Sequence, residues 1–127
     1  MQSANLHEAS YRHGDWGPAY LLHTDSLALG VLRLRPGDSV ENHLHWHCDE
    51  SFVVVEGTAT LWLDARESVE LGEGEVHSCS PGEMHHLRND SAQDFRCVFI
   101  KTPPSPGDTI PVPWQPGDPY PDVPARP

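Results

Sequence analysis

Residues 37–57 read GDSVENHLHWHCDESFVVVEG, and this stretch decides the fold expected for the chain. It places His43, His45, His47 and Glu50 within eight residues, followed by an apolar run and a glycine. Side chains two apart in a strand point to the same face, so His43 and His45 share one face. Imidazole is the commonest neutral metal ligand, and a carboxylate balances the charge of a divalent cation. The pattern favours a metal site over its alternative, a solvated turn that is rich in histidine.

A second stretch, residues 74–89, has a similar build and reads GEVHSCSPGEMHHLRN. A strand-like run leads through a Pro-Gly turn to two adjacent histidines, His85 and His86. If His85 faces inward, the period-two rule turns His86 outward. His86 is therefore the weaker ligand candidate of the two.

The two stretches together resemble the paired sequence signature of the cupin superfamily. The first motif of that signature, G-x5-HxH-x4-E-x6-G, is matched at every fixed position, by Gly37, His43, His45, Glu50 and Gly57. The second, G-x5-P-x-G-x2-H-x3-N, is matched by Gly74, Gly82, His85 and Asn89. Ser80 stands where the second pattern has proline, and Pro81 follows it. Two linked motifs are much more specific than either motif alone.

The resemblance implies an all-β fold, the cupin double-stranded β-helix, which is an antiparallel jelly-roll barrel in a single domain. It also implies that His43, His45, Glu50 and His85 are metal ligands inside the barrel mouth. Inward faces that repeat every second residue allow opposed sheets to deliver side chains into one cavity. Ligand type does not choose among Fe, Mn, Ni, Co, Cu and Zn, so the expected cofactor is a divalent transition metal of open identity.

Composition limits the partners and the cell compartment. The 127 residues suit one domain, and 8 Lys plus Arg against 19 Asp plus Glu give a formal charge of −11. That balance opposes binding to nucleic acid or to an anionic membrane. No apolar run approaches the roughly 18 residues of a spanning helix, and no secretory signal is evident, so a cytoplasmic location is expected. Three cysteines without a CxxC pair, Cys48, Cys79 and Cys97, are expected to stay reduced.

The chain divides into an N-terminal extension (residues 1–18), a barrel (19–102) and a tail (103–127) with ten of the 13 prolines. Strands are expected at residues 20–23, 27–34, 51–56, 58–64 and 95–101. Residues 51–56 and 58–64 would form a hairpin about Gly57, and residues 65–69 would connect onward. Proline lacks a donor, so the tail should neither continue a sheet nor form a helix. It is expected to contribute little to metal binding, either disordered or laid along the barrel, with candidate anchors at Ile110, Val112, Trp114 and Tyr120.

Four ligands on an octahedral ion leave two positions for a small-molecule substrate. The sequence therefore indicates an enzyme acting on a small oxygenated metabolite, with dioxygenase chemistry placed ahead of isomerase, epimerase or lyase chemistry on a sugar-like substrate. A non-catalytic metal- or ligand-binding cupin is the alternative from another class. His47 and His77 are the candidate acid–base residues, and Trp46 is the aromatic side chain expected near the site. Cupin barrels commonly pair through a sheet, so the resemblance also implies a homodimer.

Overall fold

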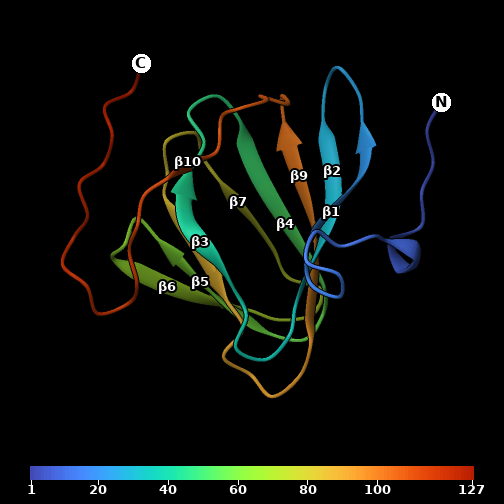
Figure 1. The fold of residues 1–127 in the computed structure, drawn as a ribbon, viewed down its shortest axis with the longest axis horizontal. Helices are drawn as coiled ribbons and strands as arrows, with labels where there is room; N and C mark the ends of the chain where they lie inside the picture. Colours follow the sequence, from blue (N-terminus) through green and yellow to red (C-terminus); the bar gives the residue numbers. More distant parts are fainter.

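The computed structural model describes residues 1–127 as one 3-10 turn and ten strands (Figure 1). The turn, η1, spans Leu6–Glu8, and the strands are β1 (Gly17–His23), β2 (Ala28–Leu34), β3 (Ser39–Leu44), β4 (Asp49–Glu56), β5 (Ala59–Leu63), β6 (Glu67–Leu71), β7 (Val76–Cys79), β8 (His85–Arg88), β9 (Phe95–Thr102) and β10 (Ile110–Pro111). They form two five-stranded sheets, ordered β1-β2-β9-β4-β7 and β10-β3-β8-β5-β6. Every pairing between neighbouring strands is antiparallel.

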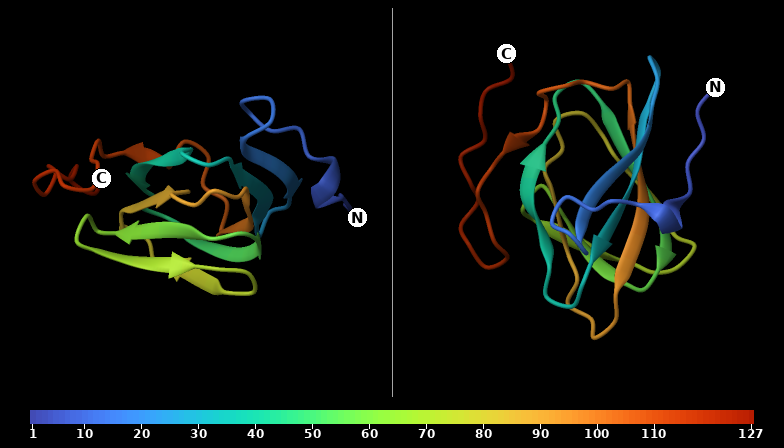
Figure 2. Two further views of the ribbon diagram at one scale, coloured as in Figure 1. Left: turned by 90° about the horizontal axis from the view of Figure 1, so that it is seen from below. Right: turned by 45° about the vertical axis from the view of Figure 1, so that its right-hand side comes forward.

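The two sheets face each other and enclose one apolar core (Figure 2). Alternate residues of each strand point inward, as Phe95, Cys97 and Phe99 do on β9. Burying one such side chain stabilises the fold by about 1.5–3 kcal/mol. Cys97 is fully buried in this core, as expected for a small hydrophobic residue. The arrangement confirms the predicted all-β jelly-roll architecture.

The predicted hairpin about Gly57 is wrong. β4 pairs with β7 and β9 in one sheet, whereas β5 pairs with β6 and β8 in the other. Gly57 therefore lies where the chain crosses between sheets, with a φ of 75°. A Cβ at this position would collide with the carbonyl oxygen of Asp94. A glycine between two strands looks the same in a sequence whether the chain turns back or crosses over.

The predicted connection at residues 65–69 is also different in the structure. β6 begins at Glu67 and pairs with β5, after a turn in which Asp64 and Ala65 both have positive φ. Four of the five β6 residues are exposed. Such a strand at the edge of a sheet is held by backbone pairing, so it carries little of the apolar alternation that marks a strand in a sequence.

The C-terminal tail lies along the outside of the sheet that contains β3 (Figures 1 and 2). Contrary to the prediction, the tail does extend a sheet, because Ile110 and Pro111 of β10 pair with Leu44 and His43 of β3. β10 is the outermost strand, so Pro111 has no further partner that would need its missing N–H. Of the candidate anchors, Val112 and Trp114 are buried, whereas Tyr120 is exposed and contacts Arg66.

The N-terminal segment folds against the opposite sheet. Its two histidines, His7 and His13, are exposed. Arg12 donates its backbone N–H to Pro18, and β1 begins one residue before that proline, at Gly17. This segment brings Trp16 and Arg12 to the open end of the barrel. No helix of this chain has the length and apolarity required to cross a bilayer.

Candidate metal centre

Both sheets contribute to a cluster of histidines and one glutamate. His43 lies on β3 directly opposite His85, the first residue of β8, and His45 follows the end of β3. Glu50 comes from β4 in the facing sheet. Leu44, between His43 and His45, is fully buried on the other face of β3, under the tail. The alternation predicted from the sequence therefore holds at this position.

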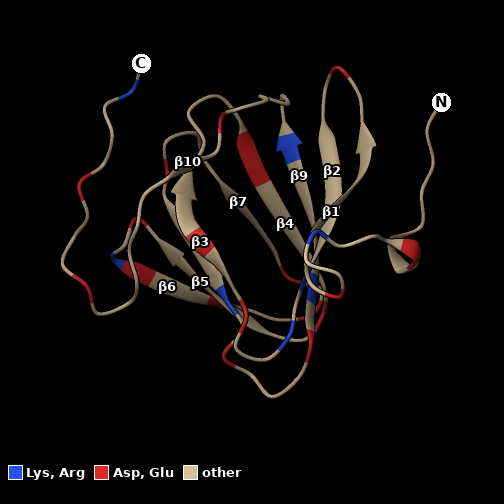
Figure 3. Ribbon diagram, viewed as in Figure 1, with Lys and Arg blue, Asp and Glu red and all other residues tan.

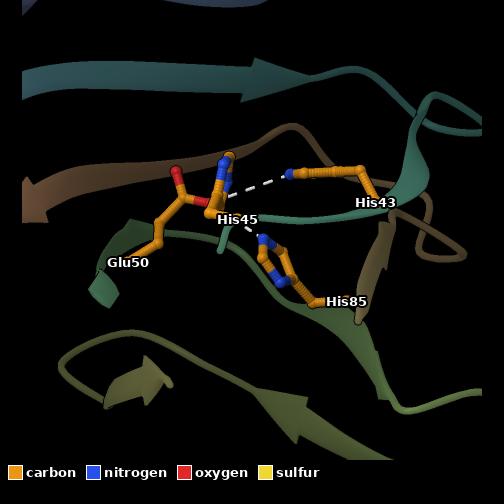
Figure 4. A group of neighbouring side chains, drawn as sticks. All are labelled: His43, His45, Glu50 and His85. Carbon is orange, nitrogen blue, oxygen red and sulfur yellow. Dashed lines mark hydrogen bonds and ion pairs between the residues drawn. The ribbon is translucent and has the colours of Figure 1, made fainter. Parts of the chain in front are cut away.

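The four side chains point toward one another (Figure 4). The Nε2 atoms of His85, His45 and His43 lie 2.9, 3.1 and 3.9 Å from Oε1 of Glu50. The ligand atoms of all four residues lie within 4.8 Å of one another. His45, Glu50 and His85 are buried, and the His43 side chain is 12% exposed. The structure thus brings together all four residues that the resemblance assigned as ligands.

Backbone carbonyls set the orientation of each imidazole. Nδ1 of His43 lies 2.6 Å from the oxygen of Glu41, and Nδ1 of His85 lies 3.1 Å from that of Glu83. Nδ1 of His45 lies 2.9 Å from the backbone oxygen of Asp108. A carbonyl oxygen only accepts, so each Nδ1 carries the proton. In a neutral ring Nε2 then presents a lone pair, and all three lone pairs face Glu50.

The charges around this point call for a cation. Burial lowers the pKa of His85, which keeps this ring neutral at pH 7. A carboxylate oxygen and imidazole lone pairs repel one another unless a positive charge lies between them. The donor set therefore fits a divalent transition metal, and it does not select one metal among Fe, Mn, Ni, Co, Cu and Zn.

Metal affinity is expected to fall as the pH drops through about 6.5, because an imidazole must lose its proton before it can bind a metal. The lowered pKa of His85 means that the unfolded chain takes up a proton on this residue at higher pH than the folded chain does. Acidification through that range should therefore also destabilise the metal-free fold. Chelator competition with Zn²⁺ at about pH 7.5, 6.5 and 5.5 checks the first effect. Equal affinity at all three values would contradict a site of three histidines.

A cavity of about 560 Å³ opens directly onto the metal centre. His43, Glu50 and His85 form part of its wall. Four aromatic side chains also line it: Trp16, Tyr20, Phe52 and Phe99. Two basic residues, Arg12 and Lys101, complete this part of the wall. Another depression, of about 550 Å³, lies over Gln2 and Asp25 and contains none of the four ligands. Of these two cavities, the one at the metal centre is therefore the one that would bring a substrate to the ligands.

The two predicted acid–base histidines do not line this cavity. His47 is exposed in the loop between β3 and β4, where its backbone N–H donates to Asp108. His77 is half-buried on β7, and its ligand atom lies within 4.8 Å of those of Cys79 and Glu83. Burial raises the pKa of the Cys79 thiol, so this group stays protonated. A role of either histidine as acid or base therefore stays a prediction, without support from the lining of the cavity.

Two further sequence interpretations change in the structure. Trp46 was expected near the site, but it packs outside the sheet with Leu44, Met84 and Val112. It follows the period-two rule with Leu44, which faces away from the ligands. His86 does point away from the cavity, yet it is fully buried, because Trp114 of the tail covers it at a centroid distance of 6.2 Å.

Cys48 lies close to the ligands without being one of the four. It is 2% exposed, and burial, reinforced by the charge of Glu50, raises the pKa of its thiol to about 11. The thiol therefore stays neutral at pH 7. All three cysteines are free and buried.

Sequence reasoning missed Asp108 and Lys101. Asp108 lies in the tail, and nothing local connects it with His45, 63 residues earlier. Lys101 did carry a signal, because it is the chain's single lysine and continues the inward series Phe95, Cys97 and Phe99. A charged residue at an inward position of an apolar strand indicates a functional site.

Comparison with known proteins agrees with the fold. TcmJ, a tetracenomycin polyketide synthase protein of Streptomyces glaucescens, is 32% identical over 91 residues, which cover 67% of this chain and 60% of TcmJ. A mannose-1-phosphate guanylyltransferase of Sinorhizobium fredii is 30% identical over 88 residues, covering 68% of this chain and 17% of the enzyme. The chain thus spans less than two thirds of either relative.

A solved structure with a double-stranded β-helix domain, from Klebsiella pneumoniae, superposes with a TM-score of 0.76 at 21% identity. The superposition covers 87% of this chain and 97% of that one. The family described as "Cupin domain" matches residues 30–101, which include both motifs and all four ligands. The chain belongs to this cupin family.

Proposed function

We propose that this protein is a metal-dependent enzyme that acts on a small oxygenated metabolite in the cavity above the ligands. The observation that carries the proposal is the convergence of three imidazole Nε2 atoms on the carboxylate of Glu50 at the wall of that cavity. A site that only retained a metal for structural reasons would have no need of a cavity of about 560 Å³ beside it.

His43, His45, Glu50 and His85 would hold the metal, at the wall of the cavity. A divalent transition metal bound there supplies Lewis acidity toward a substrate oxygen, or a site for dioxygen if the metal is iron. The buried rings of Phe52 and Phe99 give the cavity an apolar wall, and polar interactions are stronger where such a wall limits access of water. Lys101 and Tyr20, joined by a hydrogen bond of 2.8 Å, supply donors on the cavity wall.

Among the reaction types, we place redox-neutral chemistry at a carbonyl group ahead of oxidation. This order reverses the one drawn from the sequence. Two observations support it. The first is that the relative TcmJ is named as a polyketide synthase protein, and polyketides are built from chains rich in carbonyl groups. The second is that the cavity wall contains hydrogen-bond donors, Lys101 and Tyr20, of the kind that could stabilise a developing oxyanion. A cytoplasmic location and a homodimer remain predictions from the sequence.

The experiment measures two signals from one set of samples. Protein loaded with Zn²⁺, Ni²⁺, Mn²⁺ or Fe²⁺ is mixed with a panel of hydroxy-carbonyl and 1,3-dicarbonyl compounds. Exchange of the hydrogen next to the carbonyl is followed by NMR in heavy water, and dioxygen uptake is followed with an electrode. Metal-free protein and the His85→Ala variant are the controls.

Exchange or rearrangement with Zn²⁺ and without oxygen uptake is the expected result. If only the Fe²⁺-loaded protein consumes dioxygen, dioxygenase chemistry would replace the redox-neutral assignment. Absence of turnover with every metal, in protein that retains the metal, would overturn the enzyme proposal in favour of a binding module.

A further inference from the structure

The basic residues of this acidic chain fall into two groups. Four of the eight form ion pairs with carboxylates, at N···O distances of 2.6–3.3 Å: Arg33, Arg35, Arg88 and Arg96. The other four, Arg12, Arg66, Lys101 and Arg126, form none. Arg66 stacks on Tyr120, and Arg126 donates to the backbone oxygen of Trp46, both outside the cavity. Arg12 and Lys101 line the metal cavity.

Lys101 is held in place by uncharged partners. It continues the inward series at the end of β9 and pairs with Glu50 at the start of β4. Figure 3 shows the basic end of β9 in blue and the acidic start of β4 in red. Its Nζ donates to the hydroxyl of Tyr20 at 2.8 Å and lies 5.4 and 5.8 Å from the ring centroids of Tyr20 and Phe99. Aromatic rings stabilise a nearby ammonium without neutralising it. Since an ammonium has three hydrogens, two remain for a ligand.

The charge inside the cavity is positive once a divalent metal is bound. Arg12 and Lys101 add two positive charges to the wall, and Glu41 is the one acidic lining residue besides the ligand Glu50. The positive charge of a bound divalent metal is larger than the single negative charge of Glu50. The chain as a whole has a formal net charge of −11, so the charge of the cavity is opposite in sign to that of the whole protein.

Flat apolar walls lie around Lys101 and the metal centre. Phe52 and Phe99 are each 4% exposed, and Trp16 and Tyr20 complete the aromatic lining. The ring of Phe52 lies 6.1 Å from that of the ligand His85, centroid to centroid. Aromatic walls favour a planar, unsaturated body, since flat rings stack with little loss of entropy. A sugar would require many neutral polar partners instead.

We infer that the cavity binds a small organic carboxylate with a planar, unsaturated body, and that its carboxylate pairs with Lys101 and, at the rim, with the exposed Arg12. The inference rests on the proposed function in one respect only: an additional oxygen of the ligand, such as a hydroxyl beside the carboxylate, would face the metal. Recognition of the carboxylate uses this chain's own basic residues and does not require turnover.

The test uses four probes that differ in charge and in one hydroxyl: benzoate, benzamide, 2-hydroxybenzoate and 2-hydroxybenzamide. Binding to the full chain, both Zn²⁺-loaded and chelator-treated, is measured by NMR titration and by quenching of tryptophan fluorescence. Lys101→Met removes the charge and keeps the apolar stem. Arg126→Met is the matched control, because Arg126 is also unpaired but lies outside the cavity. Circular dichroism and metal content establish that each variant is folded.

Each carboxylate is expected to bind at least about 10-fold more tightly than its amide, and Lys101→Met should weaken carboxylate binding by about 10- to 100-fold, as for a hydrogen bond to a charged group. Arg12→Met should have a smaller effect, and Arg126→Met none. Equal binding of carboxylate and amide, or unchanged binding by Lys101→Met, would overturn the inference. Benzoate does not chelate strongly, so its dependence on Lys101 should persist without metal. If the protein shows no turnover but benzoate binding still depends on Lys101, the enzyme proposal is refuted and the carboxylate site is supported.

Discussion

Replacing any one of His43, His45 or His85 by alanine is expected to lower metal affinity by more than about 100-fold, beyond the 10- to 100-fold typical of supporting residues. Each substitution removes one Nε2 from a site that the two sheets hold rigidly. Glu50→Gln keeps the size of the side chain and removes its charge, so it should also weaken binding strongly. The measurement is metal per chain by mass spectrometry, together with chelator competition and circular dichroism.

His47→Ala is the matched control for these substitutions. His47 belongs to the same histidine-rich segment, but its side chain is exposed and lies outside the cavity. Metal content should therefore remain close to that of the original protein, and so should any turnover. Loss of the metal from His47→Ala with retention by His43→Ala would show that the coordinating pair is shifted by two residues.

The second large effect is expected from Asp108, in the tail. Its backbone oxygen accepts from Nδ1 of His45, and its carboxylate accepts from the backbone N–H groups of Trp46 and His47, at 3.0 and 2.8 Å. Asp108→Ala should lower metal affinity by about 10- to 100-fold, because the loop that carries His45 loses its support. It should also lower the free energy of unfolding by about 2 kcal/mol, in the range for hydrogen bonds to a charged group.

Asp122→Ala, an exposed acidic residue further along the tail, should change neither quantity. Burial opposes the charge of Asp108, but the hydrogen bonds from Trp46 and His47 outweigh it and lower the pKa of the carboxyl. The stabilisation by Asp108 is therefore present above the ordinary pKa of about 3.9 and is lost as the pH falls through the lowered value. The difference in unfolding free energy between the original protein and Asp108→Ala should disappear in strong acid.

Ending the chain at Thr102 tests the same contacts more severely. The sequence predicted that such a protein would keep its metal, since the tail was expected to contribute little to metal binding. In the structure the tail pairs with β3 at His43 and Leu44, and Asn42 exchanges hydrogen bonds with Val112. Truncation should therefore cost metal affinity even in molecules that remain folded. Full occupancy of a truncated, folded chain would refute this role of the tail.

Local spacing in the sequence predicted which neighbouring histidines share a face, and the resemblance to the cupin motifs supplied the expected ligand set. His43 and His45 share a face because a strand repeats every two residues, and the same rule turned His86 away from the cavity. Glu50 and His85 were expected as ligands because the cupin motifs that the chain resembles place a glutamate and a histidine at these positions. The face relations of neighbouring residues depend on bonded geometry within a few residues, so the distant parts of the chain do not change them.

Only the tertiary structure decided which segments meet. Gly57 marks a crossing between sheets, β6 is an exposed edge strand, and Asp108 reaches His45 from 63 residues away. The same holds for Lys101, whose inward position could be read from β9, although its lack of a carboxylate partner could not. Pairing across long loops depends on packing and on the competition of 19 acidic groups for eight basic ones, and neither leaves a periodic trace in the sequence.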